Sequence, residues 1–246
     1  MKSFYQSLLV LVLSVLYLNS SAQLNFTPTS NTATITTALQ GRGVTISGLT
    51  IGGNGAAELA NSIGTFTAGK SNLAFPNIRI ASGLVITTGS ATNATDSTSS
   101  VKGPNNHMGI SLGDPLPTIS TDNDLDQVTT FDKFDLRYIT FTIVPDGNIL
   151  TGTIVFASEE YPTYVGSAFN DACAIIIDGP GIVNNGGYTD LDANVATNSR
   201  NLAVFSSGNS LAINEVNSGT PGSQNDGITT INTLNSDFYI RNYYQY

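Results

Sequence analysis

Short runs of β-branched and aromatic residues recur along this chain, separated by glycine, asparagine, aspartate and proline. Such runs favour strands, because branched side chains pack well on a pleated surface and the intervening residues suit turns. The predicted strands are residues 44–51, 64–67, 83–88, 136–144, 152–157, 172–177, 202–205 and 211–216. Long helices do not alternate with them, so the pattern predicts an all-β fold, a β-sandwich or jelly roll.

Helical signals are few. Ser30 suits the cap of a short helix that runs to Leu39 with Gly41 as its end, and residues 56–61 form a second short candidate. Residues 90–113 and 184–199 are rich in serine, threonine, asparagine and glycine, which predicts long exposed loops. With no internal repeat and no obvious linker, residues 23–246 are expected to form a single domain.

The first 22 residues have the pattern of a secretory signal. Met1-Lys2 precedes an apolar stretch at residues 8–18, and Ser20-Ser-Ala22 supplies small residues at a cleavage site before Gln23. The apolar stretch is shorter than the roughly 20 residues that a membrane-spanning helix needs. We therefore expect an exported, extracellular protein without a membrane span once the signal is removed.

The charge balance excludes one class of partner. The chain has a net charge of −9, and removal of Lys2 with the signal leaves −10. Phosphate backbones are bound by clustered lysine and arginine, whereas the few basic residues here are scattered. Nucleic acid is therefore not an expected partner.

Cys173 is the only cysteine, so no disulfide can form within the chain. It lies in the apolar run of residues 172–177, where a small buried side chain is expected in place of a reactive thiol. The fold must then be held by its apolar core, with metal binding as a possible addition.

Acidic and amide side chains gather between two predicted strands. Glu159 and Glu160 follow the strand at 152–157, and Asn170 and Asp171 precede the strand at 172–177. Neighbouring carboxylates repel each other unless they are solvated, protonated or neutralised by a cation. The pattern fits either a solvated loop or a structural Ca²⁺ site.

A second acidic group is formed by Asp122, Asp124 and Asp126. These alternate positions share one face if the segment is extended, or converge if it curls around an ion. An EF-hand is excluded, because Gln127 and Lys133 stand where its glycine and glutamate are required. An ordinary solvated turn and a calcium loop of another type both remain. Taking the two groups together, we predict a structural calcium site.

The central segment resembles a known family. The matching residues are Phe156-Ala-Ser-Glu-Glu-Tyr-Pro162, Phe169-Asn-Asp171 and Gly179-Pro-Gly181, and weaker matches occur at residues 43–47, 63–67, 81–89 and 122–126. This pattern resembles the choice-of-anchor L domain of secreted bacterial surface proteins. The resemblance implies an exported β-rich module, used in proteins that varied C-terminal anchors attach to the cell surface, and it supplies no catalytic residues.

Catalytic signals are weak. His107 is the only histidine and lies in the predicted loop at 90–113, and neither a Gly-x-Ser-x-Gly nor a His-Glu-x-x-His motif is present. We therefore predict a non-catalytic surface or adhesion-type module that binds an unidentified extracellular protein or glycan.

The alternative is a carbohydrate-binding or glycoside-hydrolysing module. It would use Glu159 or Glu160 with Asp171, beside Tyr161 and Tyr164. The chain contains no tryptophan, the strongest stacking side chain for a sugar, and packing of Tyr161 against the rim of the sandwich is the preferred interpretation.

The last residues suggest an incomplete edge. Residues 237–246 resemble the approach to the family's last strand, so we expect this chain to lack that strand and its anchor. An unpaired edge can pair with other chains, which predicts fraying or self-association at this end.

Overall fold

The computed structural model describes residues 24–53, 62–68, 80–88, 123–126, 128–131, 136–158, 160–182 and 199–239. Several sequence predictions lie outside these ranges: the signal peptide, the helix at 56–61, the loop at 90–113 with His107, most of the loop at 184–199, and the residues from 240 to the end.

One sheet has three strands, with β1 (Leu24–Pro28), β3 (Ile63–Ala68) and β4 (Ser82–Ile86) in the order β1-β3-β4. Both pairings are antiparallel. The predicted strands at 64–67 and 83–88 are confirmed here, whereas β1 was not predicted.

The longest ladder joins β2 (Val44–Gly53) to β5 (Arg137–Pro145) in antiparallel register. The register shifts between Ser47 and Thr50, where Gly48 adopts a positive φ of 64°. A bulge of this kind inserts one extra residue into the strand. As a result, Ile46 and Leu49 are both buried although they are three positions apart.

Helix α2 (Thr32–Leu39) is capped by Asn31, whose side-chain oxygen accepts a hydrogen bond from the Thr34 N–H at 3.0 Å. The prediction of Ser30 as the cap was wrong by one position, since the Asn31 side chain reaches the free N–H groups of the first turn. The helix ends at Leu39, as predicted, and Gln40 is its C-cap in place of Gly41. Among the described residues, no helix has the length and apolar character to span a membrane.

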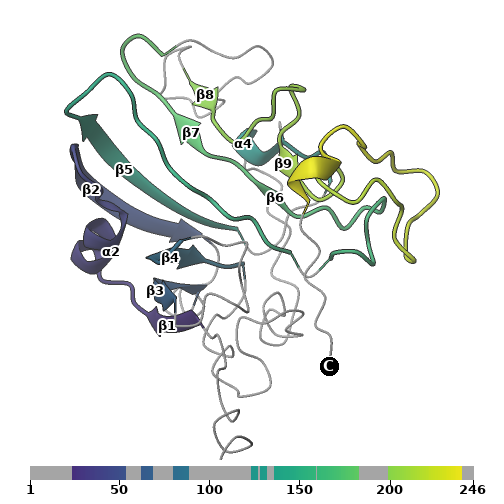
Figure 1. Ribbon diagram of the computed structural model, residues 1–246, viewed down its shortest axis with the longest axis horizontal. Coiled ribbons are helices and arrows are strands. Elements are labelled where there is room, and N and C mark those ends of the chain that lie inside the picture. The colour runs from purple at the N-terminus through teal and green to yellow at the C-terminus, as the bar shows by residue number, and fades with distance from the viewer. Residues whose placement is uncertain are drawn as a thin grey trace, which may run out of the picture.

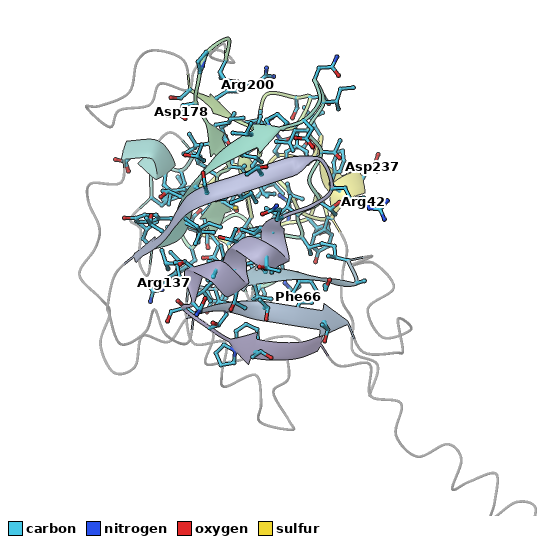
Figure 2. The ribbon with its side chains drawn as sticks, turned by 90° about the vertical axis from the view of Figure 1, so that its left-hand side faces the viewer. Arg42, Phe66, Arg137, Asp178, Arg200 and Asp237 are labelled. Atoms are coloured by element: carbon cyan, nitrogen blue, oxygen red, sulfur yellow. The ribbon has the colours of Figure 1, made fainter. Side chains whose placement is uncertain are left out.

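The core lies where the helix meets both sheets. Ile35 of α2, Leu49 of β2 and Ile63 of β3 form it, with Leu84 of β4 and Ile139 of β5 packed against them. Figure 2 shows the β2–β5 ladder and the three-stranded sheet as separate layers with α2 beside them. The predicted class is confirmed: the fold is β-rich and built of several antiparallel sheets with short helical elements.

The second half of the chain has shorter pairings. β6 (Ala172–Cys173) pairs with β9 (Leu211–Ala212), and β7 (Ile176–Ile177) pairs with β8 (Arg200–Asn201). The single strands predicted at 172–177 and 211–216 are therefore interrupted or cut short, and 202–205 contributes only an isolated bridge from Val204 to Ser210.

The side chain of Asn201 explains why the predicted strands at 172–177 and 202–205 are interrupted. Asn201 Oδ1 accepts hydrogen bonds from the N–H groups of Ile175, at 3.1 Å, and Ala203, at 2.9 Å. A side chain that takes backbone partners in this way competes with the ladder. The pattern of β-branched and aromatic residues, from which the strands were predicted, gives no sign of such side-chain hydrogen bonds.

Residues 152–157 were predicted as a strand but form no ladder with another described segment. The chain is extended and runs between β5 and the β6–β7 segment in Figure 1. Ile154 and Val155 each remain about half exposed, at 49% and 48%. This segment therefore provides no sheet ladder to position the turn that follows it, and other contacts hold that turn in place.

Candidate functional site

The acidic turn, defined here as residues 158–171, connects this extended segment to β6. Its backbone folds through successive turns, in which the Tyr164 N–H donates to the Glu160 carbonyl at 2.8 Å and the Ser167 N–H donates to the Tyr164 carbonyl at 3.0 Å. The family-like motif of the sequence is thus a compact turn between two sheet segments.

A serine and an aspartate close the two ends of the turn. The Ser158 hydroxyl donates to Asp171 Oδ2 at 2.7 Å, and the same hydroxyl oxygen accepts from the Glu160 N–H at 3.0 Å. The Asp171 carbonyl also accepts from the Ile213 N–H at 3.1 Å, which fixes the start of β6. Ser158 was not predicted as a site residue, although it stands within the Phe-Ala-Ser-Glu-Glu-Tyr-Pro motif.

The Asp171 carboxyl group lies in an unfavourable environment for a negative charge. Although Asp171 keeps part of its surface in solvent, desolvation by the surrounding protein raises its pKa, and the Ser158 hydrogen bond lowers it by a smaller amount. Among the described residues, no basic side chain forms an ion pair with it. A cation bound here would relieve the cost of the charged form.

Asn170 joins three separate segments. Its side-chain Nδ2 donates to Thr129 Oγ1 at 3.2 Å, and its Oδ1 accepts from the Asn214 N–H at 2.9 Å. Both ends of the amide therefore have protein partners, and only the second lone pair of Oδ1 is available to a metal ion.

A long irregular segment covers the acidic turn. We name residues 213–239 the C-terminal strap. Three of its N–H groups, from Gly222, Gln224 and Asp226, donate to carbonyl groups of the turn at 2.7, 2.9 and 3.1 Å. Figure 1 shows the strap and the turn together at the right-hand end of the molecule. These hydrogen bonds hold the turn in place, because the preceding segment at 152–157 forms no ladder with another described segment.

Gly222 is required by the closeness of this contact. A Cβ atom at this position would lie 2.1 Å from the Thr163 carbonyl oxygen and 2.4 Å from that of Pro162. Both obstacles are backbone atoms, which cannot move aside as a flexible side chain would. Only glycine allows the strap to approach the turn so closely.

Asn214 provides a buried side-chain clamp between strap and turn. Its Oδ1 accepts from the Gly166 N–H at 2.8 Å, and its Nδ2 donates to the Ser167 carbonyl at 3.0 Å. Asn214 was not among the predicted site residues. The available signal was a polar amide inside the apolar run of residues 211–216, because a buried amide is retained only where its partners are satisfied.

Tyr161 is held by both its hydroxyl group and its ring. The hydroxyl donates to the Val216 carbonyl, and the ring packs on Tyr239 with centroids 5.1 Å apart. Burial raises the pKa of Tyr161, with smaller contributions from Tyr239 and Asp171. The ring of Tyr164 packs similarly on Phe169, at 5.2 Å. Tyr161 therefore has a packing role, but it packs against the C-terminal strap and not against the rim of a sandwich as predicted.

The structure brings only part of the predicted metal set together. Glu160, Asn170 and Asp171 all belong to the acidic turn, whereas Asp122 and Glu159 lie outside the described residues. Among those described, no three acidic, histidine or cysteine side chains converge as metal ligands would.

The second acidic group is not extended, which was one of the two conformations considered for it. Residues 123–126 form a helical turn, α4 (Asn123–Asp126), and alternate positions of a helix do not share one face. The backbone of Asp124 is described but its side chain is not, and Asp126 is exposed. Thr129, which follows α4, is bonded to Asn170, so the two acid-bearing segments are neighbours.

The Cys173 side chain is half-buried, and burial raises the pKa of its thiol. Desolvation disfavours the thiolate, which is the reactive form. This environment fits the predicted packing role.

The raised pKa of Asp171 predicts a pH dependence of stability. Because the native state holds this proton to a higher pH than the unfolded chain, the stabilisation is complete below the unfolded pKa and is lost as pH rises through the native pKa. In EDTA, Asp171→Asn should therefore be more stable than the wild type at about pH 7, and the difference should close towards about pH 4. Urea unfolding across this range measures it.

Ser158→Ala is the matched variant for this experiment. It removes the hydrogen bond that lowers the Asp171 pKa, so its loss of stability with rising pH should be steeper than that of the wild type. An Asp171→Asn protein that is less stable than the wild type at neutral pH in EDTA would contradict the account.

Comparisons with known proteins agree with the sequence motif. The family model described as the choice-of-anchor L domain matches residues 22–246. Neither the search of curated proteins nor the search of solved structures returned a match. The matched region includes the whole acidic turn and the C-terminal strap. The chain therefore belongs to the choice-of-anchor L domain family.

Proposed function

We propose that this chain is an exported, non-catalytic module at the cell surface, that it binds a partner outside the cell, and that calcium stabilises its acidic turn. Its family membership suggests a secreted surface protein, and the signal pattern of residues 1–22 supports export. The partner-binding role and the calcium site are parts of the proposal.

The observation that carries the calcium proposal is the desolvated Asp171 carboxylate without a basic partner among the described residues. Charge is otherwise scarce in this chain, at 11% of residues. A carboxylate kept in such a place is costly unless something compensates its charge. Ca²⁺ accepts flexible sets of carboxylate, carbonyl and water oxygens, so a turn with many carbonyl groups suits it better than a rigidly octahedral ion.

The neighbouring segments supply further oxygen ligands for the same ion. Glu160 belongs to the turn, and the bond between Asn170 and Thr129 brings the segment after α4 to it. In the proposal, Asp171 and Glu160 are the principal ligands. The set is completed by Glu159, Asn170, Asp122, Asp124 and Asp126.

Several side chains support a non-catalytic role. The Ser158 hydroxyl is used to bridge Asp171 and the Glu160 N–H. The side-chain amides of Asn170 and Asn214 each use both their oxygen and their nitrogen in structural hydrogen bonds. Tyr161 and Tyr164, which a glycan-binding alternative would use, both pack against other rings of the chain.

Export is tested on intact cells of the native host. The mature protein should begin at Gln23 and should be released or degraded when whole cells are treated with a protease that cannot enter them. N-terminal sequencing and quantification of the protein make the measurement. A protein that retains Met1 and is protected in intact cells would overturn the proposal.

Calcium should raise the stability of the folded chain. A site that binds only the native state contributes about 2.7 kcal/mol at a free ion concentration about 100 times its dissociation constant. For a domain of this size this corresponds to an increase of roughly 5–10 °C in melting temperature over the value in EDTA. Asp171→Asn should remove the increase, because it removes the central ligand.

Asp178→Asn is the control for this measurement, because Asp178 follows β7 outside the acidic turn. It should retain the full calcium response. Identical melting curves in EDTA and in excess Ca²⁺ for the wild type would remove the calcium site from the proposal. Export and partner binding would be unaffected by that result.

A further inference from the structure

The acidic turn and the C-terminal strap together form one end of the molecule and differ in charge from the rest of it. In sequence they contain six acidic residues and no lysine, arginine or histidine: Glu159, Glu160, Asp171, Glu215, Asp226 and Asp237. The nearest described arginine before the strap, Arg200, lies beside Asp178 on the β7–β8 pair, at the top of Figure 2. The turn and the strap therefore carry a net negative charge with no basic side chain of their own.

Four large apolar side chains of the turn and the strap are exposed: Phe169, Ile228, Leu234 and Phe238. Phe169 of the turn is 63% exposed, and Ile228 of the strap is 89% exposed. They come from segments that are bonded to one another, because the Asp226 N–H donates to the Gly166 carbonyl at 3.1 Å. Ile231 packs on the same glycine: its Cγ2 lies 3.2 Å from the position that a Gly166 Cβ would occupy.

The loop that carries Ile228 is held in a defined conformation. Asp226 Oδ1 accepts from the N–H groups of Ile228, at 2.8 Å, and Thr229, at 2.6 Å, while Oδ2 accepts from the Thr229 hydroxyl. Gly227, between them, has a positive φ of 71°. An exposed apolar side chain on such a loop loses little conformational entropy on binding, which is the property of an interface anchor.

We propose that this end of the molecule, with Phe169 and Ile228 as anchors, is the docking surface for a basic protein segment that carries apolar side chains. The inference rests on the proposed role as a surface module and names its partner class. A second copy of the chain would bring the same acidic surface against itself, and nucleic acid would present like charge. A segment with lysine or arginine around an aliphatic or aromatic residue complements both the charge and the anchors.

A library of short random peptides displayed on phage, selected against the full chain, tests this pairing without a known partner. Enriched peptides should combine lysine or arginine with apolar residues, and synthetic copies should bind more weakly as salt is raised. Ile228→Ser and Phe169→Ser should each weaken binding about tenfold, because truncating an anchor commonly costs more than 1 kcal/mol.

Ile149→Ser is the matched control, because Ile149 is 78% exposed but lies next to β5, outside the turn and the strap. It should leave the affinity unchanged, and Ile228→Ser and Ile149→Ser should keep the wild-type melting temperature, since each alters an exposed side chain that is not one of the ring contacts described above. No enrichment, enrichment without basic residues, or equal loss with Ile149→Ser would overturn the proposal. Export and the calcium response are measured on the same variants, so their failure is distinguishable from failure of the docking surface.

Discussion

The buried amide of Asn214 is the interaction on which the functional end of this molecule depends. It satisfies one backbone N–H and one backbone carbonyl of the acidic turn from a position on the C-terminal strap. Loss of the amide would leave buried polar groups unpaired, each at a cost of about 1–3 kcal/mol. The adjacent extended segment forms no ladder among the described residues, so the strap supplies the order that a regular sheet would otherwise provide. Gly222 then allows the backbones to touch.

This arrangement explains how the acidic turn can keep a fixed conformation although it carries the partly desolvated carboxyl group of Asp171. The strap bonds hold the turn closed, and desolvation by the protein around the turn raises the pKa of Asp171, although part of this residue remains in solvent. The same bonds set the loop of Ile228 against Gly166. In the proposed function, an ion compensates the charge on the inside of the turn while its outer side and the strap present apolar anchors to a partner. Stability and binding would then be linked through one set of contacts.

The sequence predicted the all-β class and the longer strands well, because alternation and β-branched residues report on ladders such as that of β2 and β5. It placed Glu160, Asn170 and Asp171 in one turn correctly. It did not predict that the strand at 211–216 would end at Ala212, because Asn214 acts through contacts with residues almost fifty positions away. The helical turn at Asp126 was missed for a similar reason: four residues give no periodic signal, and tertiary contacts such as Asn170 with Thr129 decide the conformation.

Hydrogen exchange of individual backbone amides tests the central claim most directly. The Gly166, Gly222 and Gln224 N–H groups bridge turn and strap, so they should exchange slowly and with similar protection. In Asn214→Ala all three should exchange faster by at least about tenfold, while the Asp146 amide, bonded beside the β2–β5 ladder, should keep its wild-type rate. Rapid exchange of the three amides in the wild type, or unchanged rates in Asn214→Ala, would contradict the account.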